Sequence, residues 1–252
     1  MDENKKTIIP GMIEKAARLS SHTVTDEDLK AINKYALTAL TAEEVFTFSA
    51  VLCDNEIDRQ FERFNLKALQ DLQKLFLGKT VIKDHYHSAD NQVARIYATE
   101  LEQGTKTLAS GELYTKLIAK CYMVRTASNA DLIAEIKGGI KKEGSVGCAI
   151  SGSICSICGT DNTKSYCRHW AGRSYDKEGG KALCTFTLTG AKDAYEFSLV
   201  AVPAQKAAGV SKSYTGKTIY DEGIEEEIVN ESIDEKAKEL KIRAKLVVAR
   251  AR

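Results

Sequence analysis

The segment CSICGTDNTKSYCRHWAG, residues 155–172, gathers four soft metal donors in a short polar stretch. The donors have the spacing C-x2-C-x8-C-x-H and are Cys155, Cys158, Cys167 and His169. Zinc prefers four tetrahedral ligands drawn from thiolate and imidazole. A polar stretch of this length is too short to bury a core of its own, so a bound ion would fix its fold. The pattern predicts a small zinc-knuckle insertion over residues 152–184.

Two other interpretations of these cysteines stay open. They are buried thiols without a ligand, or Cys155 and Cys158 form a redox pair, which normally starts a helix after a strand. Cys184 is a spare donor that replaces His169 as fourth ligand in one alternative, although its segment ALCTFTL is typical of a core strand. Because four ligands fill the coordination sphere and no H-E-x-x-H or H-x-E signature occurs, we expect the zinc to be structural.

The overall charge and the amino terminus restrict the partners. The formal net charge is +1, so nothing in the total favours a nucleic acid or a membrane partner. No apolar run approaches the ~18–20 residues of a membrane span, and the start MDENKK is unlike a secretion signal. We therefore expect the seven cysteines to be thiols in a reducing compartment, where clustered cysteines are more often metal ligands than disulfides.

Hydrophobic periodicity predicts an α+β fold. The patterns predict helices at 65–78 and 128–139, with Asn65 and Ser128 as their caps. The predicted strands, marked by alternation or β-forming residues, are 43–54, 79–87, 93–101, 112–124, 144–151, 182–190 and 194–204. With few crossover helices between strands, we expect a mixed or antiparallel sheet or a barrel, and among these we choose a mostly antiparallel, β-barrel-like core with flanking helices. We predict a helical extension over 1–40, a core domain over 41–210, and an acidic linker with a helical tail over 211–252.

The candidate catalytic residues are histidines and one serine. His85 and His87 lie at the end of a predicted strand, where a side chain can face a cleft, although such histidines are more often solvated loop residues. An H-x-H pair can also bind a metal, but no third ligand lies nearby in the sequence. Ser198 lies in the apolar strand YEFSLVAVPA, so its hydroxyl must face a cleft or bond to a backbone carbonyl. The chain has no G-x-S-x-G elbow, which disfavours an α/β-hydrolase.

Several segments, in order, resemble the tailed-phage prohead (capsid maturation) proteases, which are related in fold to the herpesvirus assemblin proteases. LGKTVIKDHYH resembles the family's G-x-x-v-x-x-D-H segment, and VARIYATEL its i-G-r-v strand, with Ala94 in place of glycine. CDNEIDRQFERFN and GSVGCAIS resemble an early acidic strand and the s-v-G-f strand. YEFSLVAVPAQKAAGV resembles the box E-x-S-x-V-x-x-P-A-x-x-x-A, and some members carry a similar C-S-I-C-G…C-x-H…C insert. The resemblance covers about 43–210.

This resemblance implies an assemblin-like serine endopeptidase. His85 aligns with the family's histidine and would act as the base for Ser198. No histidine follows His169, so an acid would orient His85, or the site is a dyad; Glu196 is the tentative third member, because it shares the face of Ser198 on a strand. Asp84 and the acids of 221–231 are weaker options for that role. Backbone amides near SVGC, Arg95 or Arg173 would stabilise the oxyanion.

The resemblance also implies a setting. The substrates would be phage scaffold and major capsid proteins, with self-cleavage, inside a procapsid assembling in the host cytoplasm, and the protease would be a homo-oligomer. The alternative is a non-catalytic zinc-binding structural or scaffold protein of a phage particle.

Overall fold

The computed structural model describes residues 24–202 and 208–211, and all statements below concern these residues. Three α-helices lie among ten strands in this part of the chain. The helices are α1 (Asp26–Ile32), α2 (Leu66–Leu75) and α3 (Ala130–Lys137). The strands are β1 (Val45–Asp54), β2 (Glu62–Phe64), β3 (Thr80–Lys83), β4 (Ala94–Thr107), β5 (Leu113–Val124), β6 (Gly144–Cys155), β7 (Ser174–Lys177), β8 (Gly180–Leu183), β9 (Phe186–Leu199) and β10 (Gly209–Ser211). The class is α+β, as predicted from the sequence.

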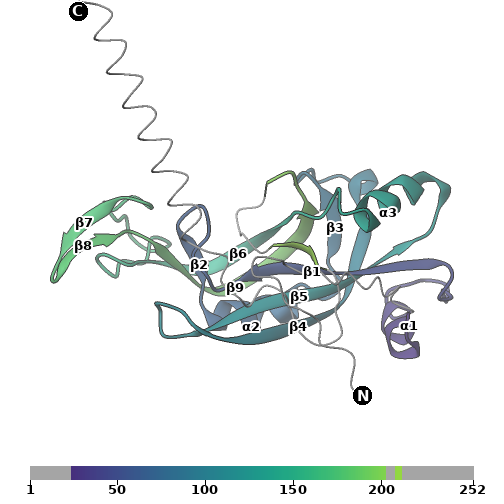
Figure 1. Cartoon of the computed structure of the whole chain (residues 1–252), viewed down its shortest axis with the longest axis horizontal. Coiled ribbons are helices and arrows are strands. Elements are labelled where there is room, and N and C mark those ends of the chain that lie inside the picture. Colours follow the sequence, from purple (N-terminus) through teal and green to yellow (C-terminus); the bar gives the residue numbers. More distant parts are fainter. Residues whose placement is uncertain (1–23, 203–207, 212–252) are drawn as a thin grey trace, which may run out of the picture. The chain divides into compact units, whose positions relative to one another are not determined.

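Eight strands form one mixed sheet, and β7 and β8 form a separate hairpin at the opposite end of the domain from α1 and α3 (Figure 1). The strand order is β10-β1-β5-β4-β3-β9-β2, and β6 pairs with β9 along the other edge of that strand. β2 and β3 run parallel to β9, whereas the other pairs are antiparallel. The central strand β9 is therefore flanked on both edges.

The sheet is not closed into a barrel, which corrects the barrel-like prediction. Closure requires a continuous hydrogen-bonded ladder around the ring of strands. In the described part of the chain, the outer edge of β6 meets the β10 region through one backbone bond, from the Gly144 N–H to the Ala208 carbonyl at 3.4 Å. Among the residues that the structure describes, no further backbone hydrogen bonds extend this contact into a ladder. The sheet is therefore open, and β6 and β10 lie at opposite ends of its strand order.

Strand β9 joins two segments that the sequence predicts as separate strands. The polar sequence TGAKDA between them has the composition of a turn, which is why the periodicity predicts a break. The structure instead absorbs the polar residues in two irregularities opposite β6, and Gly190 adopts a φ of +61° next to one of them. The result is one long strand that runs from the cysteine cluster to Ser198.

The main core lies between α2 and the sheet. Leu69, Leu72 and Phe76 of the α2 segment are fully buried among side chains such as Leu117 and Phe197. Burial of one such side chain stabilises the fold by about 1.5–3 kcal/mol. The Asn65 side chain accepts from the Ala68 N–H at 2.8 Å and so caps α2 as predicted. The helix ends earlier than predicted, with Phe76 as its C-cap, and Gly78 (φ +77°) lies in the turn to β3.

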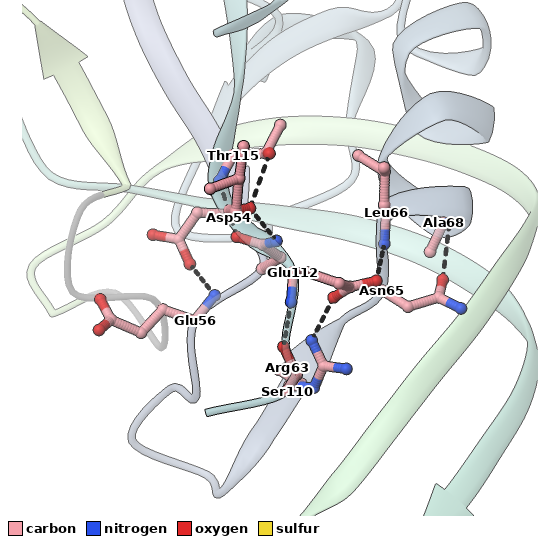
Figure 2. A network of polar contacts seen from close by, with 11 residues as sticks. Asp54, Glu56, Arg63, Asn65, Leu66, Ala68, Ser110, Glu112 and Thr115 are labelled. Atoms are coloured by element: carbon pink, nitrogen blue, oxygen red, sulfur yellow. Dashed lines mark hydrogen bonds and ion pairs between the residues drawn. The ribbon is translucent and has the colours of Figure 1, made fainter. Parts of the chain in front are cut away.

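A polar network holds the start of α2 against the β4–β5 hairpin (Figure 2). Glu112 accepts from Arg63 at 2.6 Å and from the Leu66 N–H at 3.2 Å. The carboxylate thereby contacts β2 and the first turn of the helix, where an anion is favourable. Asp54 lies nearby, buried at the end of β1, where its carboxylate accepts from the Glu56 N–H and from the Tyr114 hydroxyl. The contacts of Glu112 therefore hold β2 and the start of α2 against the turn between β4 and β5.

The remaining predicted segments are described only in part. Thr25 caps α1 through a capping box with Asp28, whereas residues 1–23 of the predicted extension lie outside the described residues. α3 begins after a 3-10 turn, with Asn129 rather than Ser128 as its N-cap. Almost all of the predicted linker and tail, 212–252, also lies outside the described residues. The core-domain boundaries 41–210 therefore remain a prediction.

Candidate functional site

The four predicted metal donors come together after β6. The donor atoms of Cys155, Cys158, Cys167 and His169 all lie within 4.8 Å of one another, so this cluster could hold a metal ion. The Sγ atoms of Cys158 and Cys167 are 3.5 Å apart, and Cys167 Sγ lies 3.3 Å from His169 Nδ1. A tetrahedral ion with bonds of about 2.3 Å to sulfur places its sulfur ligands ~3.8 Å apart. The side chains are therefore arranged at distances that suit one ion.

The local fold explains this convergence. Cys155 ends β6, and the chain then turns at once, with the Gly159 N–H donating to the Cys155 carbonyl at 2.9 Å and Gly159 at a φ of +73°. This glycine permits the tight turn that brings Cys158 back beside Cys155. Cys158 Sγ lies 3.2 Å from Thr160 Oγ1, and hydrogen bonding to Thr160 lowers the pKa of the Cys158 thiol to about 6. A thiol that ionises this readily is a suitable metal ligand.

The geometry argues against a redox pair. Cys155 and Cys158 lie at a strand end and in a turn, not at the start of a helix, and all seven cysteines are unpaired thiols. The cluster also has an apolar backing formed by Cys155, Cys167, Cys184 and Phe186, with Ile157 and Tyr175 packed against it. A closed set of donors with an apolar backing is typical of structural metal sites.

The second predicted site lies at the carboxyl ends of β3 and β9. These parallel strands pair Ile82 with Ser198, so the turn after β3 lies beside the serine. The His85 N–H donates to Ser198 Oγ at 2.8 Å, and His85 Nδ1 lies 2.9 Å from Glu196 Oε1. The structure thus brings together His85 and Ser198, the base and nucleophile that the resemblance implies, and Glu196, the candidate for the third member.

The turn that carries His85 is strained. Asp84 and His85 both have positive φ values, +54° and +52°, and the Tyr86 N–H closes the turn onto the Lys83 carbonyl at 3.1 Å. A left-handed conformation costs about 1–2 kcal/mol for a residue with a side chain. The Asp84 N–H donates to the Leu199 carbonyl at 2.9 Å, so both backbone amides of the turn bond to β9. The surrounding structure therefore holds the imidazole in place against local strain.

Glu196 is buried beneath the imidazole. Its side chain is 2% exposed, whereas the His85 side chain is 43% exposed. The second carboxylate oxygen, Oε2, is buried and has no hydrogen-bond partner among the described residues. Gly147, its neighbour on β6, leaves the space for this carboxylate, because an added Cβ would lie 2.4 Å from Oε1. The sequence analysis missed this role of Gly147, which only the register of β6 against β9 reveals.

Ser198 itself is closed off. It is fully buried, and its Oγ accepts from the His85 backbone and lies 3.5 Å from the Leu199 carbonyl. No hydrogen bond joins Oγ to an imidazole nitrogen in the described part of the chain. A pocket of about 420 Å³ between β1, β2 and β6 reaches Ser145, the register partner of Ser198, but Ser198 does not line it. In this conformation the hydroxyl is therefore placed beside His85 but is not accessible.

The other predicted candidates lie elsewhere. Arg95 donates to the Gly78 carbonyl at 2.7 Å, and the Arg173 guanidinium stacks over the Trp170 ring in the knuckle. His87 is exposed after the strained turn and has no role in these contacts. The acids of 221–231 lie outside the described residues. Among the described candidates for the third member, Glu196 is the acid that contacts the imidazole.

No family model, curated protein or solved structure matches the chain. Among the described residues, no helix has both the length and the apolar character needed to cross a lipid bilayer. Function must therefore be argued from the two sites.

Proposed function

We propose that this chain is a serine endopeptidase in which Ser198 is the nucleophile and His85 the general base. One observation carries the proposal: His85 contacts both Glu196 and Ser198, although it lies more than a hundred positions before them in the chain. Ser-His-acid hydrolases place an imidazole between a buried carboxylate and a serine. Here the buried carboxylate of Glu196 already holds the imidazole, and the backbone N–H of the same histidine contacts Ser198 Oγ. Backbone strain at such a residue is itself frequent at functional sites.

The chemistry follows from these placements. With Nδ1 bonded to Glu196, the neutral imidazole keeps its lone pair on Nε2, which takes the Ser198 proton as Oγ attacks the peptide carbonyl. The imidazolium then gives that proton to the leaving amine as the C–N bond breaks. Water, deprotonated by the same nitrogen, hydrolyses the acyl-enzyme and restores Ser198. Backbone N–H groups of the β6 segment SVGC, which pairs with β9 at Ser198, are the candidates to stabilise the oxyanion.

Because Ser198 is buried, this mechanism requires a conformational change. The hydroxyl is fully buried and accepts from the His85 N–H, so the Asp84–His85 turn must shift enough to expose Oγ and to bring His85 Nε2 to it before Oγ can attack. The strain in the turn favours such a movement, because leaving the left-handed conformation releases about 1–2 kcal/mol for each residue. Catalytic hydrogen bonds are often absent until substrate is bound.

The setting of the proposal comes from the resemblance to prohead proteases. It supports an assemblin-like core, scaffold and major capsid proteins as substrates, self-cleavage, a homo-oligomer, and action inside a procapsid in the host cytoplasm. The serine box and the D-H segment support this setting, since the residues they align are those found together in the structure.

Processing in cells tests this function. Wild type and Ser198→Ala are expressed with the scaffold and capsid proteins, with Ser174→Ala, an exposed serine of β7, as control. We expect cleaved products with wild type and the control, and none with Ser198→Ala. Equal processing by wild type and Ser198→Ala, or no processing by a folded wild type, contradicts the proposal.

We further propose that the ion in the knuckle is zinc and that its role is structural. Cys155→Ser or Cys158→Ser should lower the zinc content and the melting temperature before any effect on chemistry appears. Loss of activity with an unchanged fold and melting temperature would contradict the structural role.

One observation favours a second function, a non-catalytic zinc-binding structural or scaffold protein of a phage particle. Ser198 is fully buried and its oxygen already accepts from a backbone N–H, which is also the arrangement of a structural serine. In that case neither wild type nor Ser198→Ala cleaves the scaffold and capsid proteins, and Ser198→Ala only leaves the His85 N–H without its acceptor, at a cost of about 1–3 kcal/mol of stability. Urea unfolding and the processing assay together separate the two functions.

A further inference from the structure

The knuckle contains one more sulfur donor than an ion needs. Cys184 is fully buried, and its Sγ lies 3.9 Å from the Sγ of Cys155. It is not one of the four donors that lie within 4.8 Å of one another. A tetrahedral zinc site has four ligands, so this fifth donor needs a role of its own.

The backbone holds Cys184 against the cluster from the opposite side to the Cys155 turn. The Cys184 N–H donates to the Arg173 carbonyl at 2.8 Å, and its carbonyl accepts from the Gly172 N–H at 2.9 Å. These two bonds fix residue 184 across the base of the β7–β8 excursion. The thiol is therefore positioned toward Cys155 by the fold, and it is buried with Cys155, Cys167 and Phe186.

A direct ligand of the ion and a protonated thiol that bonds to a ligand require different arrangements of Cys184. As a direct ligand, Cys184 would have to displace one of four donors that are already close enough to share an ion. As a protonated thiol, it can donate an S–H bond to the Cys155 thiolate without moving, because 3.9 Å lies within hydrogen-bonding reach for two sulfur atoms. The distance of 3.9 Å suits either role, but Cys184 is not among the four donors that lie within 4.8 Å of one another, which favours the second role. The apolar surroundings of the Cys155 sulfur limit the competition from solvent for this bond.

We propose that Cys184 is a positioning residue of the metal site, which donates its S–H to the Cys155 thiolate and holds that ligand toward the ion. Three thiolates and one imidazole give the site an excess negative charge around a divalent ion. A donor to one thiolate offsets part of that charge in an apolar environment, where an uncompensated charge is costly. Groups that bond to metal ligands in this way typically raise metal affinity by about 10–100-fold.

This inference rests on the metal assignment above, but not on peptidase activity. The test is titration of the full chain with Co²⁺, and with Zn²⁺ in competition, for wild type, Cys184→Ala, Cys184→Ser and His169→Ala. The matched control is Cys121→Ala, which also removes a fully buried thiol, but from β5. The visible d–d bands of Co²⁺ report the ligand set, and the titration curve reports the affinity.

We expect Cys184→Ala to bind one Co²⁺ with the wild-type band positions and about 10–100-fold lower affinity. Cys184→Ser, which keeps a donor, should recover part of this loss. His169→Ala should shift the bands because a ligand is removed, and Cys121→Ala should match wild type in both respects.

Three results would overturn the proposal. A band shift in Cys184→Ala would make Cys184 a direct ligand, and an unchanged affinity would leave it without a role at the ion. A wild-type chain that binds no Co²⁺ would remove the metal assignment itself, whatever the outcome of the peptidase tests.

Discussion

Gly147→Ala tests the link between β6 and the Glu196–His85 pair. The new Cβ would lie 2.4 Å from Glu196 Oε1 and 3.2 Å from the carboxyl carbon, so the carboxylate must move. Glu196 is buried, and the same oxygen bonds to His85 Nδ1 at 2.9 Å, so the carboxylate cannot simply swing into solvent. Overpacking of this kind costs about 1–3 kcal/mol. For a domain of this size, each kcal/mol lowers the melting temperature by about 2–4 °C.

A double-mutant cycle separates the clash from other effects of alanine. In a Glu196→Ala background the obstructing carboxylate is gone, so Gly147→Ala should be neutral or stabilising by ~0.5 kcal/mol, since alanine loses less backbone entropy than glycine. Glu196→Gln is the matched control, because an amide of the same size keeps the clash. Urea unfolding of the six chains gives the free energies. An equal cost of Gly147→Ala in the wild-type and Glu196→Ala backgrounds would refute this placement of the carboxylate.

Three further changes test the fold around the site, each by urea unfolding. Asp84→Gly should stabilise the chain by about 1 kcal/mol by relieving the positive φ, and a destabilised variant would contradict the strained turn. Burial raises the pKa of Asp54 to about 6, above the ~3.9 of an unfolded chain, so its contribution to stability is greatest below about pH 4 and is lost as the pH rises toward 6. Asp54→Asn should remove up to about 3 kcal/mol of this pH dependence, and an unchanged pH profile would speak against the burial. Asn65→Ala should cost about 1 kcal/mol through loss of the α2 cap, and no loss would show that the cap is dispensable.

The strongly periodic elements are predictable from sequence. α2 has a capping asparagine and regularly spaced leucines, and β1 and β5 have β-forming residues over long runs, so local preference and tertiary packing agree. The short strands β2 and β10 have no such signal, because three residues are too few to show a hydrophobic alternation. They form strands only because β2 pairs with β9 and β10 pairs with β1. Whether a sheet closes into a barrel depends on long-range register, which composition does not encode.

The candidate site also contains some residues that could be predicted from the sequence and others that could not. The metal donors could be selected because their spacing is local, within one turn and a short loop. His85 and Ser198 could be paired only through the resemblance, since their contact depends on the parallel pairing of β3 with β9. Gly147 has no local signal, because it matters through the strand opposite it. Cys184 is recognisable in the sequence as a spare donor, but its contact with a sulfur 29 positions away is not.

Covalent labelling of Ser198 tests the central claim most directly. Wild type, Ser198→Ala and His85→Ala are treated with a fluorophosphonate, and peptide mass spectrometry locates the adduct. The account predicts one adduct at Ser198 in wild type, none in Ser198→Ala, and a strongly reduced rate in His85→Ala. A folded wild-type chain that stays unlabelled at Ser198, or labelling that does not depend on His85, would contradict it.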